Sequence, residues 1–183
     1  MNHVSRLLLA TAVAALLIGC NDRTDRTDSG GVLLEVEVAG NGIPFRVPVN
    51  GIDSLMVPTI TINSIVAEPG AVTSQIMDVE MERLEVRFER GDAGTRVPPP
   101  YVVDVLGTIP VGGTLTLNNW DVMSFEQFRS PPLSDLKFEN GGIDQETGLE
   151  VIRLNLIIRA FGRTRSGTNV SSVPRGQTIE FTQ

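Results

Sequence analysis

The sequence predicts an all-β protein, an antiparallel β-sandwich with one short helical segment. Three observations carry this prediction: apolar residues alternate with polar ones from Val32 onward, the alternating runs are short, and turn-forming residues separate them. Runs of this kind are typical of the strands of a sandwich. The chain has 183 residues, a length that suits one domain with appendages, and we assign residues 32–183 to a single β domain.

A hairpin is expected over residues 32–56, ahead of the sandwich proper at 57–183. The alternating apolar residues of its two runs are Leu34, Val36 and Val38, then Phe45, Val47 and Val49. Between the runs lies Asn41-Gly42, a dipeptide that favours a two-residue hairpin turn.

Five further runs with a period of two predict the strands of the sandwich proper. Their apolar residues are Ile60 and Ile62; Val103 and Val105; Leu115 and Leu117; Ile152, Leu154, Leu156, Ile158 and Ala160; Ile179 and Phe181. A period of two indicates a strand that buries one face and exposes the other.

The segment Met77 to Arg90 fits two structures. Its apolar residues are first odd-numbered (Met77, Val79, Met81) and then even-numbered (Leu84, Val86, Phe88). A β-bulge would insert one residue and cause this change of phase, whereas a helix would place four of the six near a period of 3.6. We predict a strand, because the neighbouring segments are strands.

The segment Asn118 to Pro132 breaks the period of two and predicts a short helix. Asn118 or Asn119 would cap it and Pro131-Pro132 would end it. The segment carries three of the nine aromatic residues, Trp120, Phe125 and Phe128. Their rings either plug the open end of the sandwich or form a partner surface. We favour the plug, because an exposed aromatic segment invites aggregation.

The C-terminal stretch resembles the last two strands of a fibronectin type III or other immunoglobulin-like domain. The residues that carry the resemblance are Leu154–Ala160, Gly162, Gly167, Ser171, Ser172, Thr178 and Ile179. The resemblance implies an immunoglobulin-like sandwich, and it implies nothing about a ligand, because many functions use this architecture.

The first nineteen residues have the pattern of a secretory signal. His3 and Arg6 form a positive head, and the apolar run Leu7 to Ile18 is shorter than the ~20 residues of a membrane span. The signal ends in Leu17-Ile18-Gly19-Cys20, which resembles a bacterial lipobox. The resemblance implies that Cys20 receives a diacylglyceryl group and becomes the first residue of the mature chain.

Residues 20–31 are expected to form a lipidated Cys20 followed by a tether. The sequence from Asn21 to Gly31 has no apolar residue, so it cannot bury enough surface to offset the entropy of ordering. In enterobacterial lipoproteins an Asp after the Cys favours the inner membrane, so Asn21 favours the outer membrane, although Asp22 follows. We therefore expect a lipid-anchored envelope protein, in the outer membrane rather than the inner.

Composition excludes several chemistries. The formal net charge of −7 argues against a nucleic-acid partner. His3 and Cys20 are the only His and Cys, so the mature body has no His base, no thiol nucleophile and no His or Cys metal ligand. We predict no catalytic residue, no metal site and no cofactor.

Two function hypotheses remain. In the first, the chain is an envelope-anchored binding or structural module whose loops or an edge strand contact a protein or a glycan. In the second, it is a small envelope enzyme or a Ca²⁺-dependent glycan-binding module that uses loop carboxylates. The candidates for the second are Glu139, Asp144 and Glu146, which lie close together in one predicted loop. Since loop acids are usually only solvated, we favour the first hypothesis.

Overall fold

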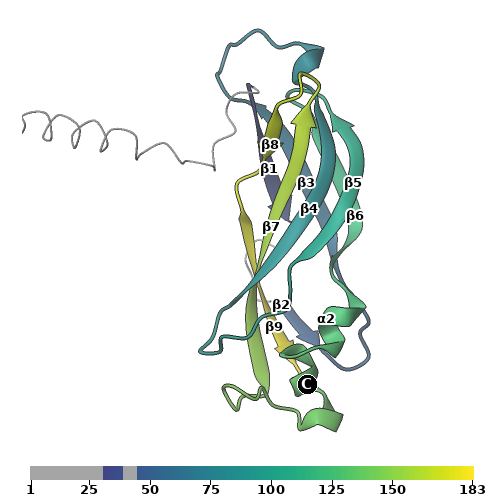
Figure 1. The fold of residues 1–183 in the computed structure, drawn as a ribbon, viewed down its shortest axis with the longest axis vertical. Coiled ribbons are helices and arrows are strands. Elements are labelled where there is room, and N and C mark those ends of the chain that lie inside the picture. The colour runs from purple at the N-terminus through teal and green to yellow at the C-terminus, as the bar shows by residue number, and fades with distance from the viewer. Residues whose placement is uncertain (1–30, 39–44) are drawn as a thin grey trace, which may run out of the picture.

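The computed structural model describes residues 31–38 and 45–183, and it confirms the predicted all-β sandwich (Figure 1). Among these residues one sheet has the strand order β1-β3-β6, and the other has the order β2-β9-β7-β4-β5, with β8 paired to β7. The strands are β1 (Val32–Val38), β2 (Phe45–Pro48), β3 (Leu55–Val66), β4 (Val79–Arg90), β5 (Tyr101–Ile109), β6 (Thr114–Met123), β7 (Val151–Thr164), β8 (Asn169–Ser171) and β9 (Arg175–Thr182). The described helical elements are η2 (Gln75–Met77), α2 (Phe125–Arg129), η3 (Leu133–Leu136) and η4 (Phe138–Asn140).

The strand order is immunoglobulin-like. β1, β3 and β6 take the places of strands A, B and E, and β4, β7 and β9 take those of C, F and G. β5 pairs with β4 and so lies in the second sheet, rather than beside β6. The last long strands, β7 and β9, pair antiparallel from Val151↔Thr182 to Ile158↔Arg175.

The hairpin expected over residues 32–56 is not formed, and this prediction was wrong. β1 pairs antiparallel with β3, whereas β2 pairs with β9 in the other sheet, and does so in parallel. An isolated two-stranded hairpin is only marginally stable in water, so each run gains more by extending a larger sheet. Val38 of β1 and Val47 of β2 are buried in this way. The turn Asn41-Gly42 lies outside the described residues.

The segment that fitted either a helix or a strand is strand β4, and its phase change is a β-bulge. Against β7 the pairing passes from Met81↔Gly162 to Arg83↔Phe161, so β4 holds one extra residue at Glu82. The buried positions accordingly change from odd to even along the strand. The strand interpretation is confirmed.

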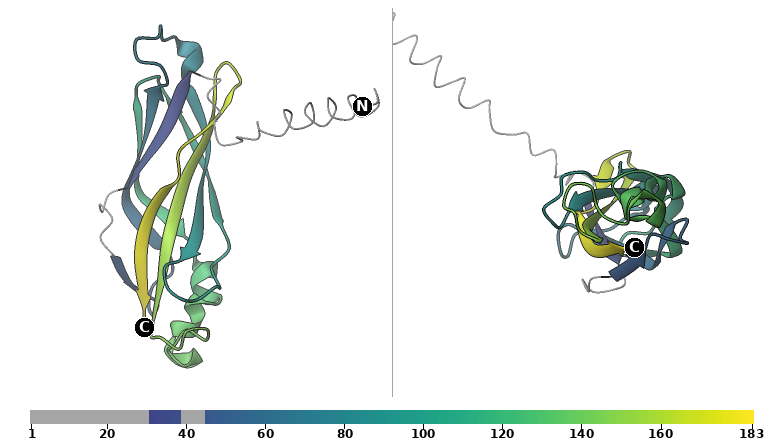
Figure 2. Two further views of the ribbon diagram at one scale, coloured as in Figure 1. Left: turned by 90° about the vertical axis from the view of Figure 1, so that its left-hand side faces the viewer. Right: turned by 90° about the horizontal axis from the view of Figure 1, so that it is seen from below.

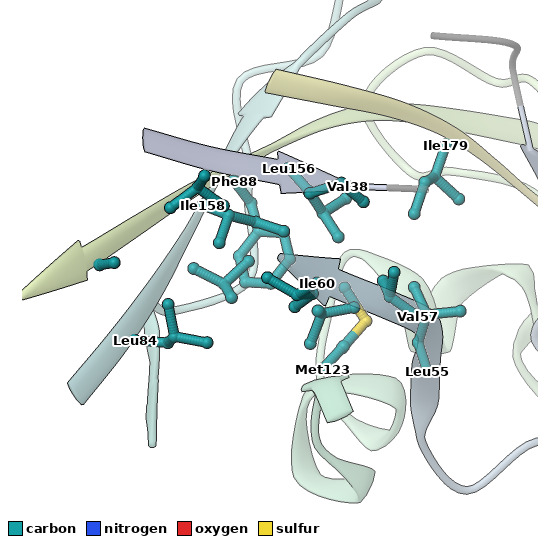
Figure 3. Packing of buried hydrophobic residues seen from close by; sticks show 14 of the residues in the cluster. Val38, Leu55, Val57, Ile60, Leu84, Phe88, Met123, Leu156, Ile158 and Ile179 are labelled. Atoms are coloured by element: carbon teal, nitrogen blue, oxygen red, sulfur yellow. The ribbon is translucent and has the colours of Figure 1, made fainter. Parts of the chain in front are cut away.

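The two sheets enclose one cluster of apolar side chains. Figure 3 shows Ile60 of β3, Leu84 of β4 and Ile158 of β7 pointing into the space between the sheets, where each is at most 1% exposed. β1 buries every second residue and exposes those between, as the alternation of valines and glutamates predicts. Removing this surface from water is the main stabilising contribution to the fold.

The sandwich is long and narrow, so its two ends are far apart (Figures 1 and 2). One end carries Gly31, the 67–78 loop and the turns 110–113 and 165–168; we call it the Gly31 end. The other carries the 91–100 loop, residues 124–150 and the C-terminus; we call it the loop end.

The bulge generates a stability prediction. A Cβ at Gly162 would lie 2.7 Å from the carbonyl oxygen of Glu80 and 2.8 Å from Val79 Cγ1, and backbone of a central strand cannot easily move away. Gly162→Ala should therefore lower the free energy of unfolding by ~1–3 kcal/mol. Gly176→Ala in β9 is the matched control, because nothing lies within 4 Å of the position that its methyl group would take. Urea unfolding measures both, and equal midpoints would contradict the close approach at the bulge.

Candidate functional site

The loop end is closed by α2, η3 and η4, which follow β6 in the chain. α2 begins after Ser124, whose backbone N–H donates to Gln127 Oε1 at 2.8 Å. The amide of Gln127 in turn donates to the carbonyl oxygen of Pro99 at 2.6 Å, which joins the helix to the 91–100 loop. The caps expected at Asn118 or Asn119 were wrong, because β6 extends to Met123 and includes both residues.

The three aromatic residues of this segment have separate surroundings. Phe128 is 1% exposed, and its ring meets that of Phe181 edge to face, with centroids 5.9 Å apart. Trp120 lies on β6 and packs, partly buried, against the core. Phe125 is 41% exposed, with the Arg129 guanidinium 4.8 Å from its ring centroid. Phe128 therefore acts as the plug, whereas Phe125 faces solvent.

A buried arginine at the loop end connects the 91–100 loop to the segment before β7. The Arg90 side chain is 4% exposed at the end of β4. It donates to Asp92 at 2.6 Å, to Asp144 at 2.8 Å and to the carbonyl oxygen of Arg96 at 3.3 Å. Burial lowers the pKa of Arg90, but the hydrogen bonds and charges of Asp92 and Asp144 outweigh it, so the net shift is upward.

Asp144 is one of the sequence candidates, and its side chain is completely buried. Besides Arg90, the Thr147 hydroxyl donates to it at 2.7 Å. Burial is the largest influence and would raise the pKa of Asp144, but the hydrogen bonds and the Arg90 charge together hold the pKa below its usual range. The pKa of Asp92 is lowered against burial in the same way, by hydrogen bonds from Arg90, Arg153 and Gly94. Both carboxyl groups are therefore ionised at neutral pH.

Glu146, the second candidate, binds the neighbouring loop. It accepts hydrogen bonds from the backbone N–H of Arg96 at 2.8 Å, and from the hydroxyl and N–H of Thr95 at 2.6 and 2.7 Å. The N–H of Arg96, followed by the Thr95 groups, lowers the pKa of Glu146. The Arg96 guanidinium also pairs with Asp135 at 2.7 Å.

Glu139, the third candidate, is exposed on η4 and does not join the other two. Within residues 31–38 and 45–183, no group of three His, Cys, Asp or Glu side chains is placed to hold a metal ion. The predicted cluster is therefore not formed. Asp144 and Glu146 accept hydrogen bonds from arginine side chains, threonine hydroxyls and backbone N–H groups, and Glu139 lies apart from them.

The loop end displays apolar side chains that the sequence reasoning did not select. Phe138 is 70% exposed, Leu149 53% and Ile143 38%. The sequence analysis did not select Phe138, because it lies outside any periodic run. Its position between two charged residues, Lys137 and Glu139, could have indicated that its ring is exposed.

Comparison with known proteins adds no relative: the sequence matches no protein-family model and no curated protein. In the part of the chain that the structure describes, no helix has the length and apolar character needed to cross a membrane.

The plug generates the next prediction. Because Phe128 is buried against Phe181, Phe128→Ala should cost ~3–5 kcal/mol of unfolding free energy. Phe125→Ala, three residues away on the same helix, should change it by less than ~1 kcal/mol, because that ring is already in contact with water. Thermal or urea unfolding compares the two variants. Equal losses would show that α2 is not packed as described.

The arginine network generates a pH prediction. Asp144→Asn removes one charge from a buried pair and should cost ~3–5 kcal/mol near neutral pH. Since the pKa of Asp144 is lower in the folded chain than in the unfolded chain, this stabilisation is complete above about pH 4 and is lost as the pH falls below that value. The difference in unfolding free energy between wild type and Asp144→Asn should therefore become smaller at acidic pH.

Urea unfolding at a series of pH values measures that difference in unfolding free energy. Glu139→Gln is the control on the same segment, where the side chain is exposed and the change should stay within ~0.5 kcal/mol. If the difference in unfolding free energy between wild type and Asp144→Asn is the same at pH 3 and pH 7, the role of the ionised carboxylate is refuted.

Proposed function

We propose that this chain is a lipid-anchored binding module of the cell envelope, which meets a partner protein through its loop end. The lipobox-like Leu17-Ile18-Gly19-Cys20 supports the anchor. The apolar side chains displayed at the loop end support the binding role. Exposed aromatic side chains such as Phe138 are enriched at protein interfaces.

The observation that carries the proposal is Phe138, which is exposed on a turn that is itself held in place. The backbone N–H groups of Asn140 and Gly142 donate to the carbonyl oxygen of Lys137 at 2.9 and 3.1 Å. The Asn140 amide donates to the Ser134 carbonyl at 2.8 Å. An aromatic ring on a prearranged turn loses little conformational entropy on binding, which favours its use as an anchor residue.

The position of the proposed anchor supports the same role. The described chain begins at Gly31, at the end of the sandwich opposite Phe138 (Figure 1). A lipid at Cys20 would therefore hold the Gly31 end close to the bilayer and turn the loop end away from it. That orientation leaves Phe138 accessible to a partner in the envelope space.

The alternative, an enzyme or a Ca²⁺-dependent module built on loop carboxylates, gains no support from the geometry. Asp144 and Glu146 direct their oxygens at Arg90, Thr147, Thr95 and Arg96. A carboxylate with these bonds would have to break them before it could bind a cation or transfer a proton.

The test combines lipid analysis with site-specific cross-linking in intact envelopes. The wild-type mature terminus should carry acyl mass and partition into detergent, and Cys20→Ala should lose both properties. A photoreactive amino acid at position 138 should form a discrete protein adduct. The same amino acid at position 106 should form none, because Leu106 is 94% exposed but lies on β5, away from the loop end.

The partner is then identified from the adduct and purified. Phe138→Asp should weaken its binding at least ~10-fold, and Leu106→Asp should leave it unchanged. A glycan instead of a protein in the adduct would replace the proposed partner class. Equal labelling from positions 138 and 106 would contradict the loop end as the binding surface.

A further inference from the structure

We propose that the Gly31 end rests on the membrane itself, with the 67–78 loop placing apolar side chains at the boundary between lipid headgroups and hydrocarbon. The inference rests on the lipid anchor of the proposed function, but it concerns the opposite end of the molecule from the partner surface. It makes the bilayer a second binding partner of the folded body.

The 67–78 loop exposes apolar side chains at the tip of the molecule. Val72 is 93% exposed and Ile76 is 61% exposed. The loop contains no Lys or Arg. Beside it lies an open groove of about 340 Å³, lined by Gly31, Leu33, Ala67, Glu68, Ala71 and Met77. Exposed apolar side chains at the tip of a long molecule are placed to contact a partner or a membrane.

Hydrogen bonds hold the loop in this position. The Ala71 N–H donates to the carbonyl oxygen of Glu68 at 3.1 Å, and Gly70 has a φ of +87°. Pro69 and Gly70 thus occupy the central positions of a type II turn, where glycine alone adopts that φ without strain. Farther along, the Ser166 N–H donates to the carbonyl oxygen of Ile76 at 3.0 Å. Val72 and Ile76 are therefore presented by a fixed loop.

The point where the described chain begins is attached to this same loop. The Ala67 N–H donates to the carbonyl oxygen of Gly31 at 3.0 Å. Residues 21–30 lie between Cys20 and Gly31, and the flexible tether that their sequence predicts would span ~18 Å on average. A lipid at Cys20 would therefore keep the loop near the bilayer, at about that distance on average. Two apolar side chains bind a membrane weakly by themselves, but the tether makes their contact intramolecular.

The charges of this end favour a neutral bilayer over an anionic one. Arg165 lies 3.7 Å from Asp78 and 3.8 Å from Glu80, so its charge is already compensated. Asp78 also accepts a hydrogen bond from the backbone N–H of Val111 at 3.1 Å. With its cation paired and acids nearby, this end does not attract anionic headgroups, and apolar contact is the attraction that remains.

A tryptophan placed on the loop tests the inference. Val72→Trp is introduced into the full mature chain together with Trp120→Phe, so that one indole reports. Leu149→Trp, in the same background, is the control at the loop end, where Leu149 is 53% exposed. The lipidated proteins are placed in phosphatidylcholine vesicles that contain bromine-labelled lipid. The indole at position 72 should emit at shorter wavelength and be quenched at least about twofold more than the indole at position 149.

A second arm separates this inference from the lipid anchor. Cys20 is the only Cys of the chain, so its thiol can be coupled to a maleimide phospholipid. If acyl mass is absent from the native protein but the coupled protein shows quenching at position 72, the lipid anchor is contradicted. The contact between the 67–78 loop and the membrane is then still supported. If positions 72 and 149 respond alike in the coupled protein, the inference is overturned, whatever the state of Cys20 in the cell.

Discussion

The buried guanidinium of Arg90 is the interaction on which the loop end depends. A charge in the interior is costly unless its donors are satisfied, and Arg90 satisfies them with Asp92, Asp144 and the Arg96 carbonyl group. Asp92 and Arg96 belong to the 91–100 loop, which joins β4 to β5, and Asp144 belongs to the segment before β7. One side chain therefore ties two connections together. The chain has a single Cys, so no disulfide within it could do the same.

This use of polar groups determines what the molecule offers to its surroundings. The carboxylates and arginines of the loop end bind one another, and those on the sides of the sheets do so as well, for example Arg153 and Glu180 at 2.7 Å. Even the aromatic ring on the outer sheet face, Phe161, lies under the Arg83 guanidinium at 4.3 Å. Apolar side chains stay exposed at both tips, Phe138 at one and Val72 at the other, and also on β5, where Leu106 is 94% exposed.

The sequence predicted the strands well and their partners poorly, for a physical reason. Alternation reports which face of a strand is buried, so β1, β4 and β7 could be recognised, and the change of phase at Glu82 revealed the bulge. Alternation does not say which strand lies alongside. Asn41-Gly42 therefore suggested that β1 pairs with β2, whereas the two strands join different sheets. The helix was predicted, but its start was placed too early, at Asn118 or Asn119, because the sequence did not show that β6 continues to Met123.

The site shows the same division. Glu139, Asp144 and Glu146 are close in sequence. Sequence alone could not show that Arg90, 54 residues before Asp144, donates a hydrogen bond to the Asp144 carboxylate. Among the aromatic residues, spacing placed Phe125 and Phe128 on one helix. It did not show that Phe181, from the last strand, is the ring that covers Phe128. Contacts between segments distant in sequence decide which candidate is structural and which is free to bind.

The separate pairing of β1 and β2 has a mechanical consequence. Under the proposed orientation, tension between the bilayer and a bound partner would run along the long axis of the sandwich, parallel to its strands (Figure 2). The first strand to feel it, β1, is joined to β3 from Val32↔Val66 to Val38↔Ile60, and the next, β2, is joined to β9. Force parallel to a strand loads all the hydrogen bonds of its ladder at once, whereas force across a strand breaks them one after another. Resistance to pulling is set by the barrier to unfolding, and this arrangement raises that barrier for a protein held at both ends.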